Sequence, residues 1–199
     1  MIITTAMLRD QWKDYGDPAG KISRMKQRGE LLRLTRGVYE TDPNVPGHCL
    51  AGAILGPSYL SFDYALSWYG LIPEAVRVYT SATFSKRKAR EFRNAFGQYA
   101  YRDVPQEVYP YGIRIEQEGA YVFQIATPEK ALCDKLYTMP PVMSQREIQR
   151  MLFDDLRIDH GMFDRLETDS LLEIGGLYRC NNLKYLMKFL RRDRAWITF

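Results

Sequence analysis

Histidine and cysteine are scarce in this sequence of 199 residues, which limits the metal and redox chemistry that it can carry. Neither His48 nor His160 has a second histidine or cysteine three or four residues away, the spacing that places two metal ligands on one helix face. Cys49, Cys133 and Cys180 lie far apart and form no Cys-x-x-Cys pair. We therefore expect three buried thiols, no disulfide framework, no metal site and no bound cofactor.

Motifs for nucleotide chemistry are also absent. The sequence contains no G-x-x-x-x-G-K-[ST] phosphate loop, no G-x-G-x-x-G dinucleotide motif and no G-x-S-x-G nucleophile elbow. Catalysis needs a nucleophile, a base or a metal within hydrogen-bonding reach of one another, and few residues for those roles are present. We predict a protein that is not an enzyme.

Long apolar runs are missing as well. No stretch approaches the roughly 20 apolar residues that a membrane-spanning helix needs. The first five residues lack the basic region and the apolar run of a secretory signal. The composition, with 46% hydrophobic and 26% charged residues, is ordinary for a globular protein. These features predict a cytoplasmic protein that does not contact a membrane.

The net charge of +4 is small, but the basic residues are unevenly distributed. Residues 21–37 hold six basic residues against a single acidic one, Glu30. Two further clusters comprise Lys86, Arg87, Lys88, Arg90, Arg93 and Arg102, and Lys184, Lys188, Arg191, Arg192 and Arg194. A run of charge is usually a solvated surface, and we interpret the second and third clusters in this way. Only the first cluster lies in a recognisable scaffold.

The first 40 residues follow the order of a winged helix: a helix, a basic helix and a hairpin. The expected elements are a helix from Thr4 or Thr5 to about Tyr15, a second helix over 19–27, and strands over 30–34 and 38–40. Gly29 is expected to end the second helix, and residues 35–37 to form a tight turn. A two-stranded ribbon is marginal alone in water, so the hairpin must pack on the helices.

The basic helix has a polar outer face. At about 100° per residue, Arg24, Gln27 and Arg28 project opposite Ile22, which faces a core with Met25. Lys21 and Ser23 lie on the flanks of this face, and Arg33 and Arg36 lie on or near the tip of the hairpin. We hypothesise that the helix residues enter a major groove of DNA while Arg33 and Arg36 hold phosphates.

Residues 41–47 are rich in proline and asparagine and predict a domain boundary. We expect a winged-helix domain over 1–45 and a larger domain over 46–199. In the larger domain the pattern predicts strands over 75–82, 97–104, 112–117 and 121–125, and helices over 50–55, 62–69, 128–137, 145–153, 162–166, 170–178 and 182–191. Ser61 and Thr127 are expected to cap the helices that follow them. The expected fold class is α+β, with a small, mostly antiparallel sheet and a helical C-terminal part.

The most prominent polar group in the larger domain lies on the helix that begins at Pro128. Lys130 and Asp134 are i,i+4 neighbours, which indicates a weak surface pair. Paired acids beside a lysine also occur in metal-dependent nucleases. However, Glu129 and Asp134 lie five apart on one helix and point to divergent faces, so a nuclease is the less favoured alternative. The tyrosines of 59–69 and 99–111 are expected to fill a core rather than to stack on bases.

Three blocks of the sequence together resemble the AbiEi family of antitoxins. Lys21–Tyr39 (KISRMKQRGELLRLTRGVY) is similar to the winged-helix signature of that family, which passes from a basic-Gly-x-Leu segment to an Arg-Gly-x-Tyr wing. Residues 57–73 (PSYLSFDYAL and GLIP) resemble the segment after the family's linker, and Ala126–Asp134 (ATPEKALCD) its later helix. The chain departs from a full winged helix because one helix, not two, precedes the basic one.

The resemblance implies an antitoxin of a type IV toxin–antitoxin system. It implies that the winged helix represses its own promoter by binding inverted repeats in double-stranded DNA. It further implies that the larger domain, with Glu129, Lys130 and Asp134 in its motif, counteracts a nucleotidyltransferase-like toxin, usually without a stable complex. The alternatives are a protein-interaction module that binds an acidic partner, or a transcriptional regulator without antitoxin activity.

Overall fold

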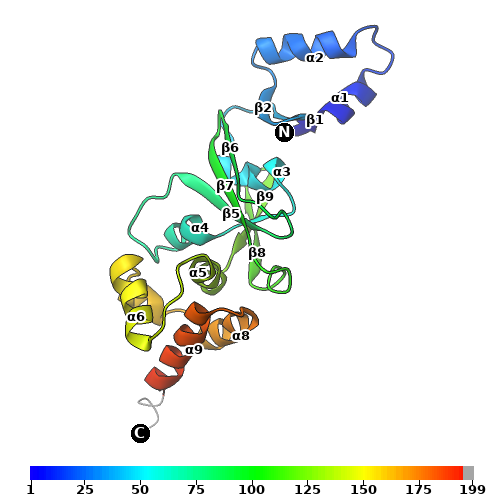
Figure 1. Ribbon diagram of the computed structural model, residues 1–199. Coiled ribbons are helices and arrows are strands. Elements are labelled where there is room, and N and C mark those ends of the chain that lie inside the picture. Colours follow the sequence, from blue (N-terminus) through cyan, green and yellow to red (C-terminus); the bar gives the residue numbers. More distant parts are fainter. Residues whose placement is uncertain (195–199) are drawn as a thin grey trace.

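The computed structural model describes residues 1–194 of the chain, and side chains as far as Arg191. The architecture is mixed α+β, with a three-stranded and a six-stranded sheet, which confirms the predicted fold class (Figure 1). The side chains of Arg192 and Arg194, counted in the third basic cluster, lie outside the described part. No helix of the described residues is long and apolar enough to cross a membrane.

The N-terminal module, residues 1–40, holds two helices and a small antiparallel sheet. Its elements are β1 (Ile2–Thr4), α1 (Thr5–Gln11), α2 (Pro18–Gln27), β2 (Leu32–Thr35) and β3 (Val38–Glu40). Strand order is β1-β3-β2, so the expected hairpin gains a third strand that we did not predict. Strand β1 also gives the hairpin the support that two strands alone would lack.

A small core of its own holds the N-terminal module together. Leu8 of α1, Ile22 of α2, Leu31 and Tyr39 of β3 are buried against one another. The partly buried Ile3, Trp12 and Met25 pack around them. Ile22 and Met25 therefore face a core as predicted, and the opposite face of α2 is left to solvent.

The larger sheet has the strand order β6-β7-β5-β4-β9-β8. Its strands are β4 (Tyr59–Leu60), β5 (Val78–Thr83), β6 (Arg90–Asn94), β7 (Gly97–Asp103), β8 (Ile113–Glu118) and β9 (Tyr121–Ala126). Three of the pairings are antiparallel, but β4 with β9 and β5 with β7 are parallel. The sheet is therefore mixed, and it includes two strands, β4 and β6, that the sequence pattern did not reveal.

Helices cover the sheet and extend the molecule away from the N-terminal module (Figure 1). They are η1 (Gly47–Leu50, 3₁₀), α3 (Ala51–Ile54), α4 (Phe62–Trp68), α5 (Pro128–Tyr137), α6 (Gln145–Arg150), η2 (Met151–Asp155, π-helical), α7 (His160–Asp164), α8 (Thr168–Leu177) and α9 (Asn181–Arg194). Helices α4 and α5 contact the sheet, and α8 and α9 contact α5 from its other side. Helix α5 is thus enclosed between two layers.

The N-terminal module joins the larger sheet through β2 and β6. The side-chain amide of Asn94 donates a hydrogen bond to the carbonyl oxygen of Leu34 at 3.1 Å. Leu34 and Val45 belong to the large hydrophobic core, whereas the N-terminal module keeps its separate core. The division at residue 45 stays a prediction, and the large core extends across it through Leu34 and Val45.

Candidate nucleic-acid interface and a buried polar network

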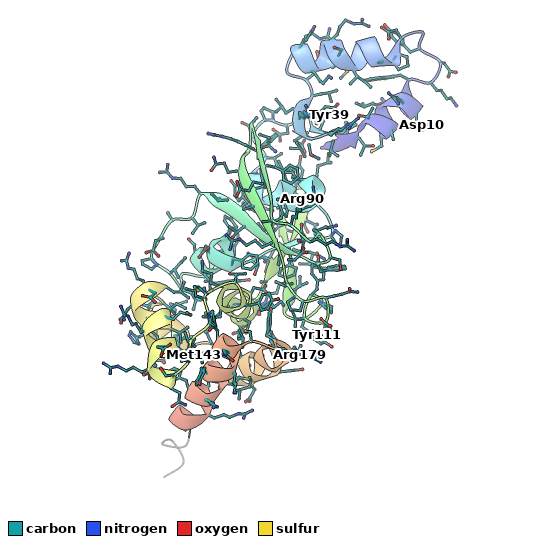
Figure 2. All side chains as sticks on the ribbon, viewed as in Figure 1. Asp10, Tyr39, Arg90, Tyr111, Met143 and Arg179 are labelled. Atoms are coloured by element: carbon teal, nitrogen blue, oxygen red, sulfur yellow. The ribbon has the colours of Figure 1, made fainter. Side chains whose placement is uncertain are left out.

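Helix α2 begins at a capped N-terminus and presents its polar face to solvent. The Asp17 carboxylate accepts a hydrogen bond from the Gly20 backbone N–H at 2.8 Å, and Pro18 occupies the first helical position. A Cβ at position 20 would collide with that carboxylate, which explains the glycine. Helix α2 lies at the end of the molecule farthest from the C-terminal helices, and its side chains opposite Ile22 are free to meet solvent (Figure 2).

The residues expected to contact DNA on α2 are exposed or partly exposed. Ser23, Arg24, Gln27 and Arg28 are exposed, and Lys21 is half-buried. Two ion pairs link this face to acidic residues of the same module. The guanidinium of Arg24 lies 3.9 Å from Asp17, and that of Arg28 lies 2.7 Å from Glu30. Exposed pairs of this kind contribute only about 0–1 kcal/mol, so a phosphate or a base can replace either acid.

Lys21 has a different environment from the rest of the face. Its ammonium lies 4.1 Å from the ring centre of Trp12 and 4.9 Å from that of Tyr15. Cation–π contacts at exposed sites contribute about 0.5–1 kcal/mol. Lys21 therefore helps to hold α2 against α1, in addition to any contact that it makes with DNA.

The wing, defined as the β2–β3 hairpin, carries two exposed arginines. Arg33 lies on β2 and Arg36 in the turn, where Gly37 has a positive φ of 81°. The carbonyl oxygen of Gly37 accepts a hydrogen bond from the Thr5 backbone N–H at 2.8 Å, which fixes the wing to the start of α1. The structure thus brings the arginines of α2 and of the wing into one module.

The other basic clusters lie elsewhere. The second cluster occupies the segment around β6 and part of β7, and the Lys86 ammonium donates to the Gly56 carbonyl oxygen at 3.0 Å. The third cluster lies on α9, at the opposite end of the molecule from α2 (Figure 1). The third cluster therefore does not extend the basic face of the N-terminal module, whereas β6 of the second cluster contacts β2 of the wing.

The pair Lys130–Asp134 is buried, and the prediction of a weak surface pair is wrong. Both side chains are fully buried, and the Lys130 Nζ lies 3.2 Å from Asp134 Oδ1. Helix α5 lies between the sheet and the C-terminal helices, so nearly every residue from Glu129 to Leu136 is enclosed. The i,i+4 spacing was recognised correctly, but its environment depends on tertiary packing.

Every polar atom of this buried pair has a partner. Asp134 Oδ2 accepts hydrogen bonds from the Tyr59 hydroxyl at 3.0 Å and from the Ser61 hydroxyl at 2.6 Å, and Asp134 Oδ1 accepts one from Tyr178. Lys130 donates to the Val108 carbonyl oxygen at 2.8 Å and to the Tyr178 hydroxyl at 2.6 Å. We call Tyr59, Ser61, Lys130, Asp134 and Tyr178 the buried network. It ties α5 to β4, to the start of α4 and to the segment after α8.

Protonation states in the buried network follow from burial. Burial and the Asp134 carboxylate both raise the pKa of Tyr59 and of Tyr178, so both phenols remain donors. Burial lowers the pKa of Lys130, and the neighbouring Asp134 carboxylate opposes this shift. Ser61 occupies the N-cap position of α4 as predicted, but its hydroxyl donates to Asp134 and makes no capping hydrogen bond to the helix.

Glu129 faces away from the buried network. Its carboxylate accepts a hydrogen bond from the Glu167 backbone N–H at 3.0 Å, next to the start of α8. Thr127 caps α5 as expected, because its hydroxyl oxygen accepts from the Lys130 backbone N–H at 3.2 Å. Glu129 and Asp134 therefore serve different contacts, as their spacing predicted.

A second polar cluster combines side chains that lie far apart in the sequence. His48 and Cys49 of η1 lie beside Glu118 at the end of β8, and the ligand atoms of all three fall within 4.8 Å of one another. Sequence reasoning missed this cluster because 70 residues separate His48 from Glu118. The pair His48–Cys49 was the only local signal.

Comparisons with known proteins support the fold alone. No protein-family model matches the chain, and no curated protein matches it in sequence. The crystal structure of the RV2827C protein from Mycobacterium tuberculosis is similar, with a TM-score of 0.55 and 12% sequence identity. The match covers 94% of this chain and 71% of that chain. The two proteins therefore share a similar fold over most of this chain.

Proposed function

We propose that this chain binds duplex DNA through α2 and the wing of its N-terminal module. The observation that carries the proposal is the exposure of Arg24, Gln27 and Arg28 on the outer face of a helix whose inner face packs on its own core. A helix with an exposed polar face and an adjoining basic hairpin is the arrangement with which winged helices contact DNA.

The side chains divide into two roles. Gln27 and Arg28 have paired donors that match base edges in the major groove, with Arg24, Ser23 and Lys21 beside them. Arg33 and Arg36 on the wing contact phosphates, which fix the register and add affinity for any sequence. Without DNA, Arg24 and Arg28 make weak ion pairs with acids of the same module. On binding, these pairs are exchanged for contacts with DNA.

We further propose that the chain is a cytoplasmic antitoxin of the AbiEi type. This part rests on the resemblance of residues 21–39, 57–73 and 126–134 to that family. The N-terminal module then represses the promoter of its own operon, and the domain over 46–199 counteracts a nucleotidyltransferase-like toxin. In this account Lys130 and Asp134 act as the internal support of the larger domain, because both are fully buried.

The DNA-binding proposal is tested by a gel shift with the DNA upstream of the gene and with a random duplex of equal length. We expect binding to the upstream DNA at a salt concentration at which the random duplex is not bound. Equal, weak binding to both duplexes would reject sequence recognition. Absence of binding to either, together with binding to an acidic protein, would favour the protein-interaction alternative.

Repression and neutralisation should be separable by substitution. We expect the double variant Gln27→Ala/Arg28→Ala to release the promoter, measured with a reporter gene, while still restoring growth of cells that express the neighbouring toxin gene. The reason is that both residues are exposed in the N-terminal module, far from the buried network (Figure 1). Loss of growth rescue at equal protein level would contradict the division of roles.

Removal of the acid that pairs with Arg28 should strengthen DNA binding. In Glu30→Gln the guanidinium of Arg28 loses its 2.7 Å partner, and one negative charge leaves the DNA-facing surface. We expect a several-fold gain in affinity at low salt that shrinks as salt rises. Glu167→Gln, an exposed acid far from α2, is the matched control and should leave the affinity unchanged. A loss of affinity in Glu30→Gln would show that Arg28 needs this partner to be positioned.

A further inference from the structure

The cluster of His48, Cys49 and Glu118 has the composition of a metal site. The imidazole Nε2 of His48 lies 2.8 Å from Glu118 Oε2, and the Cys49 sulfur completes a set of ligand atoms within 4.8 Å of one another. Nitrogen, thiolate sulfur and carboxylate oxygen are the three donors that zinc accepts in proteins. His48 and Cys49 are buried, whereas Glu118 is exposed at the surface.

Local structure holds two of the three side chains in place. His48 and Cys49 are consecutive in the 3₁₀ helix η1, and the His48 ring packs edge-on against Phe123 at 4.8 Å and Trp68 at 5.3 Å between ring centres. Glu118 lies at the turn between β8 and β9, where Gly119 has a positive φ of 60°. The imidazole and the thiol are therefore positioned by packing, and the carboxylate approaches from a surface turn.

The spacing suits one ion after a small movement. Zinc bonds of about 2.0–2.3 Å in a tetrahedron place neighbouring ligand atoms roughly 3.3–3.6 Å apart. The separation of His48 and Glu118 would have to increase by about half an ångström, and the other separations, all within 4.8 Å, would have to shrink by at most about 1.3 Å. Glu118 is exposed, so its side chain is free to rotate toward the ion.

An adjoining cavity gives a second, independent indication of a ligand. A surface cavity of about 370 Å³ is lined by His48, Cys49 and Phe123 and also by Ser58. Ser58 is 6% exposed, and its hydroxyl has no hydrogen-bond partner among the described residues. Buried polar groups without a partner are uncommon in folded proteins. A metal-bound water or anion in the cavity would supply the missing partner.

We propose that His48, Cys49 and Glu118 bind one divalent transition-metal ion of the zinc type, with an open coordination position toward the cavity that Ser58 lines. Three protein ligands with one open position are the pattern of zinc sites that hold a water or a small anion. The site lies in the larger domain and is independent of the proposed DNA contacts.

The proposal is tested with full-length protein freed of metal by a chelator and titrated with Co²⁺, then with Zn²⁺. We expect a one-to-one cobalt complex with a thiolate-to-cobalt charge-transfer band, which Zn²⁺ abolishes by competition. At a hundredfold excess over the Kd, Zn²⁺ should raise the melting midpoint by about 5–10 °C. The absence of both the band and the thermal shift would overturn the proposal.

Two pairs of variants locate the ion. Glu118→Gln should weaken Zn²⁺ binding by about 10–100-fold or more, and Glu116→Gln, on the same strand, should not. Cys49→Ser should abolish the charge-transfer band, and Cys180→Ser should keep it. Because Glu118 is exposed, its variant is expected to fold, which the melting midpoint without metal verifies. A band that persists in Cys49→Ser, or unchanged affinity in Glu118→Gln, would contradict the site.

Discussion

Replacing Asp134 with alanine should lower the free energy of unfolding by about 3–5 kcal/mol, the cost of leaving a buried charge without its partner. The change removes the only carboxylate that accepts hydrogen bonds from Tyr59, Ser61 and Tyr178 at once. It also leaves Lys130, which is fully buried, with two neutral acceptors. Denaturant unfolding followed by circular dichroism measures the effect.

A matched control is the ion pair that Lys135 of the same helix makes with Asp63 of α4. Lys135 pairs with Asp63 at 2.7 Å, but both side chains are partly exposed. Asp63→Ala should therefore cost less than about 1 kcal/mol. Equal losses in Asp63→Ala and Asp134→Ala would contradict the account of the buried network.

A double replacement distinguishes packing from charge. Lys130→Met with Asp134→Leu removes both charges and keeps the volume similar, so much of the loss should be recovered. The three hydroxyl groups that face Asp134 would remain without acceptors, so recovery should be incomplete. A double variant no more stable than Asp134→Ala would show that the hydroxyl bonds, rather than the uncompensated lysine, dominate.

Replacing Gln27 and Arg28 together should cost about 2–6 kcal/mol of binding free energy on the upstream DNA, since each base-reading side chain is worth about 1–3 kcal/mol. The loss on random duplex should be much smaller. Gln149→Ala/Arg150→Ala is the matched control, because this exposed Gln-Arg pair on α6 lies far from α2 (Figure 1). Comparable losses in both double variants would indicate a nonspecific effect of charge.

Arg36 should behave differently from this pair. We expect Arg36→Ala to weaken binding to all sequences alike and to reduce the slope of log affinity against log salt by about 1. The salt titration separates phosphate contacts from base contacts, which a single affinity does not. A sequence-dependent loss in Arg36→Ala would place the wing at the bases instead.

Local signals predicted most of the N-terminal module. Gly29 and Gly37 both have a positive φ; the first marks the C-terminal end of α2 and the second marks the turn of the wing. The spacing of Ile22 and Met25 identifies the buried face of α2. Strand β1 was missed because it has three residues and is followed at once by a helix. Its pairing with β3 is a tertiary contact that no local pattern encodes.

The larger domain was less predictable, for two physical reasons. Strand β4 has only two residues, and β6 is an edge strand with basic side chains, so both lack an apolar alternation. The parallel pairing of β5 with β7 depends on the path of the chain through β6. Propensity predicts which segments are extended but not which of them pair.

The sequence also did not predict whether each polar group is buried or which groups it contacts. The spacing of Lys130 and Asp134 was visible, but their burial depends on layers that contact α5 from both sides. Likewise, Glu118 approaches His48 and Cys49 because β8 pairs with β9, and β9 contacts η1. The exposed face of α2, by contrast, could be predicted from the helical period alone, because it depends on no contact between distant segments.

The most direct measurement of the central proposal is a footprint of the protein on the DNA upstream of its gene. We predict protection of two inverted repeats by the natural protein, lost in Gln27→Ala/Arg28→Ala and kept in Gln149→Ala/Arg150→Ala at the same concentration. Wild-type protein that leaves the upstream DNA unprotected, or a Gln27→Ala/Arg28→Ala variant that protects the same repeats equally well, would contradict DNA recognition by this helix.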